Sequence, residues 1–277
     1  MHRTGLVLAA LLLAAPGAAL AADKVQIGEG KTAPESMTAT SDGTLYAGSL
    51  AKGEIYKAAP GATKADKFID KPADGPQSVL GVWADEKDGL LWACYSQFGD
   101  NAPPSIARSY DLKTGALKGS YTLGPKSVCN DFTRGTDGTI YIADTGNGGV
   151  IRLKAGSSTP ESWILNDNLK GADGISFGPD GAVYVNSVFT SGLYRIPVNA
   201  DGSAGTPVEI MPSEPLKGTD GMRWGDDGKL YVAENANGRI DQLTIDGDKA
   251  TVKPVATGLD GPTSMTKVGN TLWVLDS

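Results

Sequence analysis

The sequence predicts an all-β fold, a six-bladed β-propeller of four-stranded blades whose last blade is closed by the N-terminal strand. Three observations lead to this prediction. A short hairpin pattern occurs six times in the 277 residues, glycine is abundant at 37 residues, and no long stretch free of glycine and proline has helical periodicity. A chain that turns this often, in units of similar length, is typical of repeated small sheets.

The repeated pattern is an Asp-Gly or Gly-Asn pair, then any residue, an aliphatic residue, Tyr or Trp, and a small or branched apolar residue. Asp-Gly favours a tight turn, and the aromatic and branched residues after it favour a strand, so each copy is a hairpin. The copies recur about every 45 residues. They define repeat units 1 to 6 and begin at Asp42, Asp88, Asp137, Asp180, Asp227 and Gly269.

Further strands surround each hairpin. A short apolar run comes before the turn and forms the inner strand, as at residues 37–39, 175–177 and 222–224. Third strands are predicted at residues 53–57, 149–153 and 192–196, and fourth strands at residues 68–69, 163–165 and 208–210. Unit 6 reaches only its second strand, so we expect Lys24–Ile27 to complete that blade and close the ring.

The N-terminus, residues 1–21, is predicted to be a secretion signal peptide. His2 and Arg3 precede an apolar stretch over residues 6–15, and Ala19-Leu20-Ala21 fits the small-x-small cleavage rule. The remaining residues, 22–277, form the single propeller domain, which we expect to be periplasmic or secreted. Disulfides persist in that compartment, so Cys94 and Cys129 are a possible pair, with buried free thiols as the alternative.

Charge and composition exclude several classes of function. The chain has 25 Lys and Arg against 32 Asp and Glu, a formal charge of −7, and lacks the basic footprint of proteins that bind nucleic acid or anionic membranes. Its one histidine, His2, lies in the predicted signal peptide, which excludes His-dependent catalytic triads and His-ligated metals from the mature protein. We expect a monomer that acts on a small molecule.

Polar residues occupy one equivalent position in most units. The inner strands of a propeller begin around one end of its channel, and seven residues before the turns stand Glu35, Asn130, Asp173 and Asp220. Units 2 and 6 offer Leu80 or Gly81, and Thr263. Three converging carboxylates are costly without a counter-charge, and oxygen donors suit one divalent cation, Ca²⁺ first and Mg²⁺, Mn²⁺ or Zn²⁺ as alternatives. The other interpretation is that Asp173-Gly174 and Asp220-Gly221 are ordinary turns.

The ends of the second strands approach the same mouth of the channel. They bring further polar side chains towards a substrate there, and loop solvation is the alternative interpretation of each. Together with one residue of the ring, the predicted substrate-binding residues are Asn130, Asp144, Asn186 and Glu234.

Four motifs, each placed ahead of a hairpin, resemble one known family. They are Pro34-Glu35-Ser36, Asn130-Asp131, Ala172-Asp173-Gly174-Ile175 and Thr219-Asp220-Gly221-Met222. Together they resemble the senescence marker protein, gluconolactonase and luciferin-regenerating enzyme family. The resemblance implies a six-bladed propeller with one divalent metal at the channel mouth, held by Glu35, Asn130, Asp173 and Asp220, and it implies that Asp220 is the general acid/base. The chain departs from the family at Asp173, where Asn is frequent, and at Val128, where sugar-lactone members carry Arg.

The predicted function is therefore a divalent-metal-dependent hydrolase of a lactone or related cyclic ester, with Asp220 as the catalytic residue. The alternative is a non-catalytic periplasmic propeller that binds a ligand or serves as a scaffold, because the fold alone does not choose between them.

Overall fold

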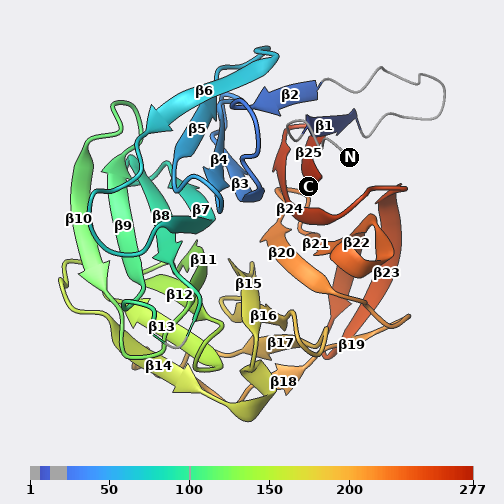
Figure 1. Cartoon of the computed structure of the whole chain (residues 1–277). Coiled ribbons are helices and arrows are strands. Elements are labelled where there is room, and N and C mark those ends of the chain that lie inside the picture. Colours follow the sequence, from blue (N-terminus) through green and yellow to red (C-terminus); the bar gives the residue numbers. More distant parts are fainter. Residues whose placement is uncertain (1–6, 13–23, 100, 277) are drawn as a thin grey trace.

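The computed structural model describes residues 7–12, 24–99 and 101–276, and in this part of the chain strands are the dominant element. The sheets stand side by side around a common centre, as a propeller requires (Figure 1). The helical elements of the described residues are two short 3₁₀ turns, η1 (Asp167–Leu169) and η2 (Asn235–Asn237). The predicted all-β propeller is confirmed. No helix in these ranges has the length and apolar character needed to cross a membrane.

Units 2 to 5 each form a separate antiparallel sheet. Unit 2 contains β7 (Ser78–Asp85), β8 (Leu90–Ser96), β9 (Ile106–Asp111) and β10 (Leu117–Thr122). Unit 3 contains β11 (Cys129–Arg134), β12 (Ile140–Asp144), β13 (Gly149–Leu153) and β14 (Glu161–Leu165). Unit 4 contains β15 (Ala172–Phe177), β16 (Val183–Ser187), β17 (Leu193–Ile196) and β18 (Val208–Glu209). Unit 5 contains β20 (Thr219–Trp224), β21 (Leu230–Glu234), β22 (Arg239–Asp246) and β23 (Lys249–Thr257), with β19 (Met211–Pro212) added in parallel at its edge.

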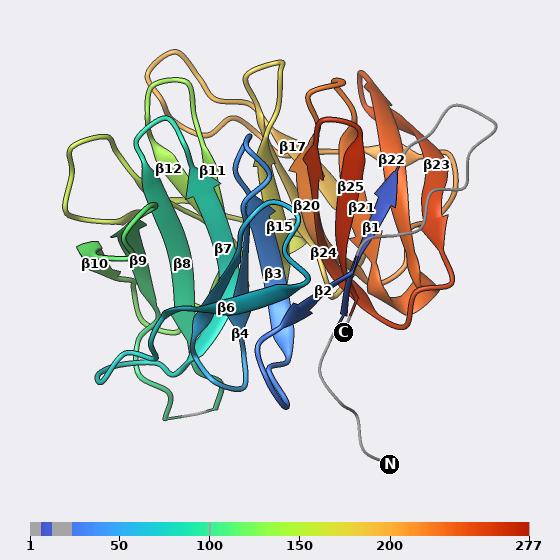
Figure 2. The same cartoon turned by 90° about the horizontal axis from the view of Figure 1, so that it is seen from above.

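The first and last units share one sheet. Its eight strands follow the order β24 (Pro262–Val268), β25 (Thr271–Asp276), β1 (Val7–Leu12), β2 (Lys24–Ile27), β6 (Lys64–Ile69), β5 (Ile55–Ala58), β4 (Leu45–Ser49) and β3 (Pro34–Ala39). The described strands thus form five sheets, and the prediction of six separate four-stranded blades is wrong in this count. The cause is the parallel pairing of β2 with β6, which continues the hydrogen bonding from unit 6 into unit 1 (Figure 2).

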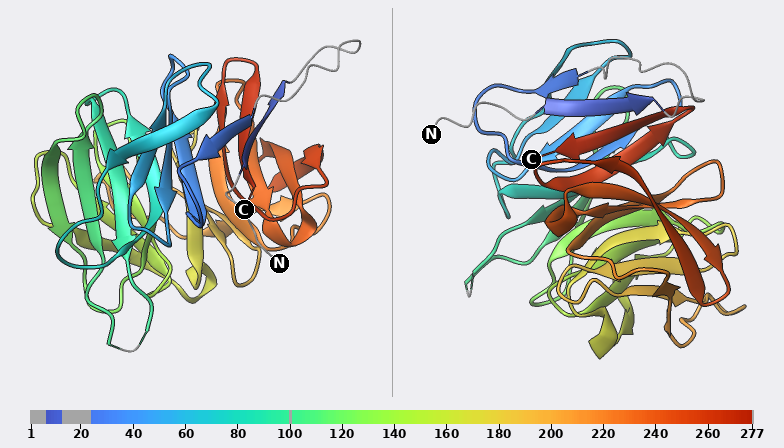
Figure 3. Two further views of the ribbon diagram at one scale, coloured as in Figure 1. Left: turned by 45° about the horizontal axis from the view of Figure 1, so that its top comes forward. Right: turned by 90° about the vertical axis from the view of Figure 1, so that its right-hand side faces the viewer.

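The closure of the ring also differs from the prediction. Lys24–Ile27 pairs with β1 and β6 and has no register with β25. The strands that flank β25 are β24 on one side and β1 on the other. Figure 3 shows these N-terminal strands between the C-terminal strands and those of unit 1. The predicted cleavage motif Ala19-Leu20-Ala21 lies outside the described residues, and the signal peptide stays a prediction.

The Asp-Gly turns join the two innermost strands of their units, as the repeat predicts. In unit 1 the Asp42 carboxylate accepts a hydrogen bond from the Thr44 amide at 3.0 Å, and Gly43 has φ +90°, a backbone conformation that favours glycine. The same Asp-to-amide bond recurs in unit 3 between Asp137 and Thr139. These carboxylates therefore shape turns.

Apolar side chains fill the space between neighbouring sheets. Between units 2 and 3, Trp92 packs against Phe132 and Tyr121, with ring centroids 5.9 and 5.6 Å apart. In the same interface a disulfide joins Cys94 of β8 to Cys129 of β11, with their Cα atoms 5.2 Å apart. This bond fixes the start of β11 to the neighbouring sheet.

Candidate metal centre

The inner strands run in the same direction along the channel. The Ser36 hydroxyl of β3 accepts a hydrogen bond from the Val82 amide of β7 at 3.2 Å, and two residues further on Thr38 accepts one from Ala84 at 3.2 Å. Equivalent positions therefore lie at the same height, which is what the ring of polar residues requires.

Each inner strand also carries a β-bulge close to its beginning. In unit 4, for example, Asp173 and Gly174 together oppose Asn186, because the register shifts between Ala172 and Ile175. A bulge re-aims the side chain of the strand that contains it. The first bulged residues of the six units are Glu35, Leu80, Asn130, Asp173, Asp220 and Thr263.

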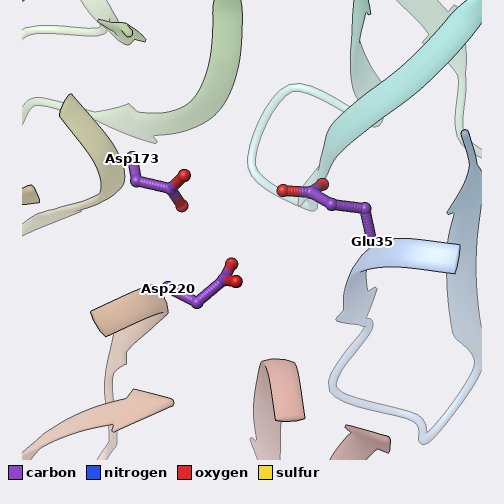
Figure 4. Close-up of side chains that lie close together, drawn as sticks. All are labelled: Glu35, Asp173 and Asp220. Atoms are coloured by element: carbon purple, nitrogen blue, oxygen red, sulfur yellow. The ribbon is translucent and has the colours of Figure 1, made fainter. Parts of the chain in front are cut away.

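Three of these residues bring carboxylates together. One oxygen each of Glu35, Asp173 and Asp220 lies within 4.8 Å of the other two. Figure 4 shows the three side chains pointing from separate strands into a common space. A small cavity beside them is lined by Glu35, Ser36, Asn130, Asp131, Asp173, Gly221, Thr263 and Ser264.

Asn130 joins the cluster through its amide. Its Nδ2 donates to Asp173 Oδ2 at 2.8 Å and to the Thr145 hydroxyl at 3.1 Å. Thr145 in turn donates to the Ala172 carbonyl at 2.6 Å. Both amide protons of Asn130 are therefore used within the protein, and its Oδ1 is left as the oxygen that can face a ligand.

Burial and mutual repulsion perturb the three carboxyl groups. Burial, followed by the charges of Asp173 and Asp220, raises the pKa of Glu35 well above its ordinary value. Burial and the charge of Asp173 likewise raise the pKa of Asp220. The pKa of Asp173 rises to about 7 through burial and the charge of Asp131, although the hydrogen bond from Asn130 lowers it.

Two buried polar atoms of the ring lack a hydrogen-bond partner in the described part of the chain. Glu35 Oε2 and Thr263 Oγ1 are buried without a hydrogen bond among the described residues. Buried polar atoms ordinarily have a partner, so these two indicate a missing one. Three carboxylates and an amide oxygen form the all-oxygen set that Ca²⁺, Mg²⁺ and Mn²⁺ prefer, and the residues fit a hard divalent cation.

A buried ion pair lies next to the cluster and was missed from the sequence. Both terminal nitrogens of Arg223 donate to the Asp131 carboxylate, one of them at 2.6 Å, so β20 and β11 are linked across the channel. The pair neutralises a fourth carboxylate. The Arg223 charge also lowers the pKa of Glu35, but it is the smallest of the causes acting on that group, and within the described residues Glu35, Asp173 and Asp220 form no ion pair with Arg223. One signal was available, since Arg223 is a charged residue between the apolar Met222 and Trp224 of the inner strand.

The predicted substrate-binding residues lie in different surroundings. Asp144 is 1 % exposed, and its oxygens accept hydrogen bonds from Ser127 and from the Val128 amide. Glu234 is fully buried and accepts a hydrogen bond from Arg239 at 2.7 Å and one from Asn237 at 2.7 Å. The structure does not bring these two side chains into the cluster; they anchor the loops at the ends of their strands.

Asn186 is also buried, at 1 % exposure, but it does contact the ring. Its Oδ1 accepts from the Gly174 amide and its Nδ2 donates to the Asp220 carbonyl. Of the predicted substrate-binding residues, Asn130 and Asn186 are thus the two that touch the cluster, and Asn186 does so through backbone groups.

Comparison with solved structures finds the same fold. Virginiamycin B lyase from Staphylococcus aureus superposes with a TM-score of 0.66 at 20 % identity, over 97 % of this chain and 81 % of the lyase. The calcium-binding protein regucalcin from Agrobacterium tumefaciens gives 0.63 at 19 % identity, over 86 % and 78 % of the two chains. A gluconolactonase from Xanthomonas campestris gives 0.62 at 18 % identity, over 85 % and 82 %. Comparison with curated protein sequences gave no significant match.

The sequence profile of the SMP-30/gluconolactonase/LRE-like region matches residues 33–275, which include every residue of the cluster. The chain belongs to the SMP-30/gluconolactonase/LRE-like family.

Proposed function

We propose that the protein is a divalent-cation-dependent hydrolase of a lactone or a related cyclic ester. The observation that carries the proposal is the convergence of Glu35, Asp173 and Asp220 in the channel, with one buried Glu35 oxygen that lacks a partner among the described residues. Membership of a family that includes gluconolactonases supports the hydrolytic chemistry.

The cation would be held by Glu35, Asn130, Asp173 and Asp220. Ca²⁺ is the first choice because several carboxylates at a site without thiolates or imidazoles favour a hard ion, and Mg²⁺, Mn²⁺ and Zn²⁺ are the alternatives. When bound, such an ion polarises a carbonyl group and makes water a better nucleophile at neutral pH.

Asp220 is the proposed general base and acid. It takes a proton from the water whose oxygen adds to the lactone carbonyl carbon. As the ring C–O bond breaks, it returns a proton to the leaving ring oxygen, so that the product is the open-chain hydroxy acid. Asp131 is less suited to this task because Arg223 occupies both of its oxygens.

The lyase neighbours suggest a different chemistry, which the composition disfavours. One of these solved structures is described as a catalytically inactive variant of the Staphylococcus aureus lyase in which alanine replaces a histidine, so that histidine is needed for the activity of that protein. The single histidine of this chain is His2, outside the region matched by the family profile. Hydrolysis by carboxylates is therefore the better-supported proposal.

The cellular setting is part of the proposal. The disulfide between Cys94 and Cys129 suits an oxidising compartment, and with the predicted signal peptide it supports a periplasmic or secreted enzyme. We propose a monomer that acts on a small molecule.

Lactone hydrolysis by chelator-treated protein, followed by proton release with and without each cation, tests the proposal. We expect turnover of at least one γ- or δ-lactone that depends on the added ion and falls at least about a hundredfold in Asp220→Asn. Asp227→Asn is the matched control, because Asp227 belongs to the same unit and bonds the Lys229 amide and the Tyr231 hydroxyl in the hairpin turn. Ion binding without hydrolysis of any lactone would favour a ligand-binding module instead.

A further inference from the structure

Asn186 bridges two ligand-bearing bulges. It lies on β16, opposite the bulge of Asp173 and Gly174. Its Oδ1 accepts a hydrogen bond from the Gly174 amide at 3.0 Å, and its Nδ2 donates to the Asp220 carbonyl at 2.6 Å. One side chain thus ties the backbone of unit 4, at the residue that follows Asp173, to the backbone of unit 5 at Asp220.

The propeller does not need an asparagine at this position to form the bulge. The residues opposite the corresponding bulges of units 1, 2, 3 and 5 are Gly48, Cys94, Ala143 and Ala233. None of these four residues has a side-chain amide, and the bulges opposite them form nevertheless. The hydrogen bonds of Asn186 therefore serve something particular to the junction of units 4 and 5.

Backbone packing at this junction is tight. A Cβ atom on Gly174 would lie 2.7 Å from the Met222 amide nitrogen and 2.8 Å from the Asp220 carbonyl oxygen. The two bulges therefore touch through their main chains, and a shift of one moves the other. A side chain that fixes this contact also fixes the separation of the Asp173 and Asp220 carboxylates.

Substrate contact does not explain Asn186. The residue is 1 % exposed, and both its oxygen and its nitrogen are bonded to backbone groups. Because both polar atoms of the Asn186 amide are bonded to the backbone, the side chain can affect a ligand only by positioning the Gly174 and Asp220 backbone.

We propose that Asn186 is a positioning residue that sets the spacing of the Asp173 and Asp220 carboxylates and thereby the affinity and size selectivity of the site for its cation. The inference rests on the proposed cation site. Ca²⁺ tolerates a wider and more variable oxygen cage than Mg²⁺, so a change in spacing alters the ratio of the two affinities.

The test compares Ca²⁺ and Mg²⁺ dissociation constants, measured by calorimetry on chelator-treated protein, with the free energy of unfolding of the metal-free protein. Asn186→Leu keeps the size of the side chain and removes both hydrogen bonds. Asn186→Asp keeps the acceptor for Gly174 and loses the donor to Asp220. Ser187→Ala is the matched control, since Ser187 is the fully buried neighbour on the same strand and its hydroxyl bonds the Lys170 carbonyl instead of a bulge.

We expect Asn186→Leu to bind Ca²⁺ at least about tenfold more weakly and to change the Ca²⁺-to-Mg²⁺ affinity ratio at least about fivefold. Asn186→Asp keeps the bond from Gly174 but sets a carboxylate oxygen against the Asp220 carbonyl, so it should also change the ratio. Ser187→Ala should lose stability but keep the wild-type ratio. An unchanged ratio in both Asn186 variants would overturn the inference while leaving the cation site standing. Failure of the wild-type protein to bind any ion would overturn the site itself, and the inference with it.

Discussion

The two sides of the channel hold their candidate ligands in different ways. On one side, units 3 to 5 present Asn130, Asp173 and Asp220 as an arc joined by hydrogen bonds, from Asn130 to Asp173 and through Asn186 to the backbone of Asp220. On the other side, unit 1 presents Glu35, for which the described part of the chain supplies no hydrogen bond and whose Oε2 is buried.

This difference separates what the fold stabilises from what a ligand must stabilise. The arc is organised before any ion binds, because its polar groups already have protein partners. Glu35 is half-buried, and its buried Oε2 has no hydrogen-bond partner among the described residues. A bound proton or cation would offset the cost of that buried oxygen. The comparison predicts that damage to the arc unfolds the protein, whereas changes at Glu35 affect mainly the binding of the ion.

Removal of the disulfide should have the largest effect on the arc side. Cys129 directly precedes Asn130, and the bond to Cys94 closes a segment with a sequence separation of 35. The loss of such a cross-link costs about 4 kcal/mol in the chain-entropy account. We expect the double variant Cys94→Ala with Cys129→Ala to lower the free energy of unfolding by that amount in urea titrations. Equal midpoints for the variant and the oxidised wild type would contradict this role.

A methyl group at Gly81 should displace the backbone of Asn130, the first residue of the arc. Its Cβ would lie 1.9 Å from the Asn130 carbonyl oxygen, so the backbone of unit 2 or unit 3 must move. We expect Gly81→Ala to lower the free energy of unfolding by about 3 kcal/mol. Gly124→Ala, where the new atom would be 3.8 Å from the nearest group, is the control and should change stability little. Equal losses in the two variants would show that Asn130 is not held against unit 2.

Glu35→Gln should separate ion binding from folding. The raised pKa of Glu35, caused by burial and by Asp173 and Asp220, means that its charged form is unfavourable in the metal-free protein. We expect the metal-free variant to melt no lower than the wild type, while its affinity for the cation falls at least tenfold, or about 1.4 kcal/mol. Calorimetry with Ca²⁺ and thermal melts check the two halves. A metal-free variant that melts well below the wild type would place Glu35 with the arc.

Asp241, a buried carboxyl group outside the channel, can be compared with Glu35, and its substitution should have the smallest effect of the changes considered. Asp241 is fully buried beside Glu234 and Arg239, and Glu214 is the other charged group nearby. Burial and the negative charge of Glu234 raise its pKa from the ordinary 3.8 to about 8. Here a proton would offset the cost of burial that the proposed cation would offset in the channel.

The sign of its pH dependence follows from linkage. Between pH 3.8 and about 8 the folded protein holds a proton on Asp241 that the unfolded chain releases, so this group makes stability fall as the pH rises. We expect Asp241→Asn to reduce the fall of the melting temperature between pH 5 and pH 8.5. An unchanged slope would show that Asp241 is ionised in the folded protein across this range.

Much of the fold could be predicted because short sequence motifs specify its turns and strands locally. Each Asp-Gly pair sets a turn by itself, and equal spacing then places Glu35, Asn130, Asp173 and Asp220 at equivalent bulges. The spacing of the repeats could not predict how the N-terminal strand pairs where the first and last units meet. The parallel contact of Gln26 with Lys64 joins two units into one sheet and depends on the tertiary position of the N-terminal strand.

The surroundings of the cluster were harder to predict than its members. Asp144 and Glu234 have the polar character of binding residues, but their partners, such as Ser127 and Arg239, are brought to them by loops. The pairing of Arg223 with Asp131 spans two units and has no sequence spacing of its own. Burial and partnership decide the role of a polar side chain, and both are properties of the folded chain.

The most direct test of the account is the thermal shift of chelator-treated protein on adding Ca²⁺, Mg²⁺, Mn²⁺ or Zn²⁺, with Asp220→Asn and Asp227→Asn alongside. Binding at a hundred times the Kd adds about 2.7 kcal/mol. For a domain of this size the melting temperature should then rise by roughly 5 °C or more. We expect this rise in the wild type and in Asp227→Asn, and its loss in Asp220→Asn. No rise with any of the four ions, or an equal rise in all three proteins, would contradict a cation site at the carboxylate cluster.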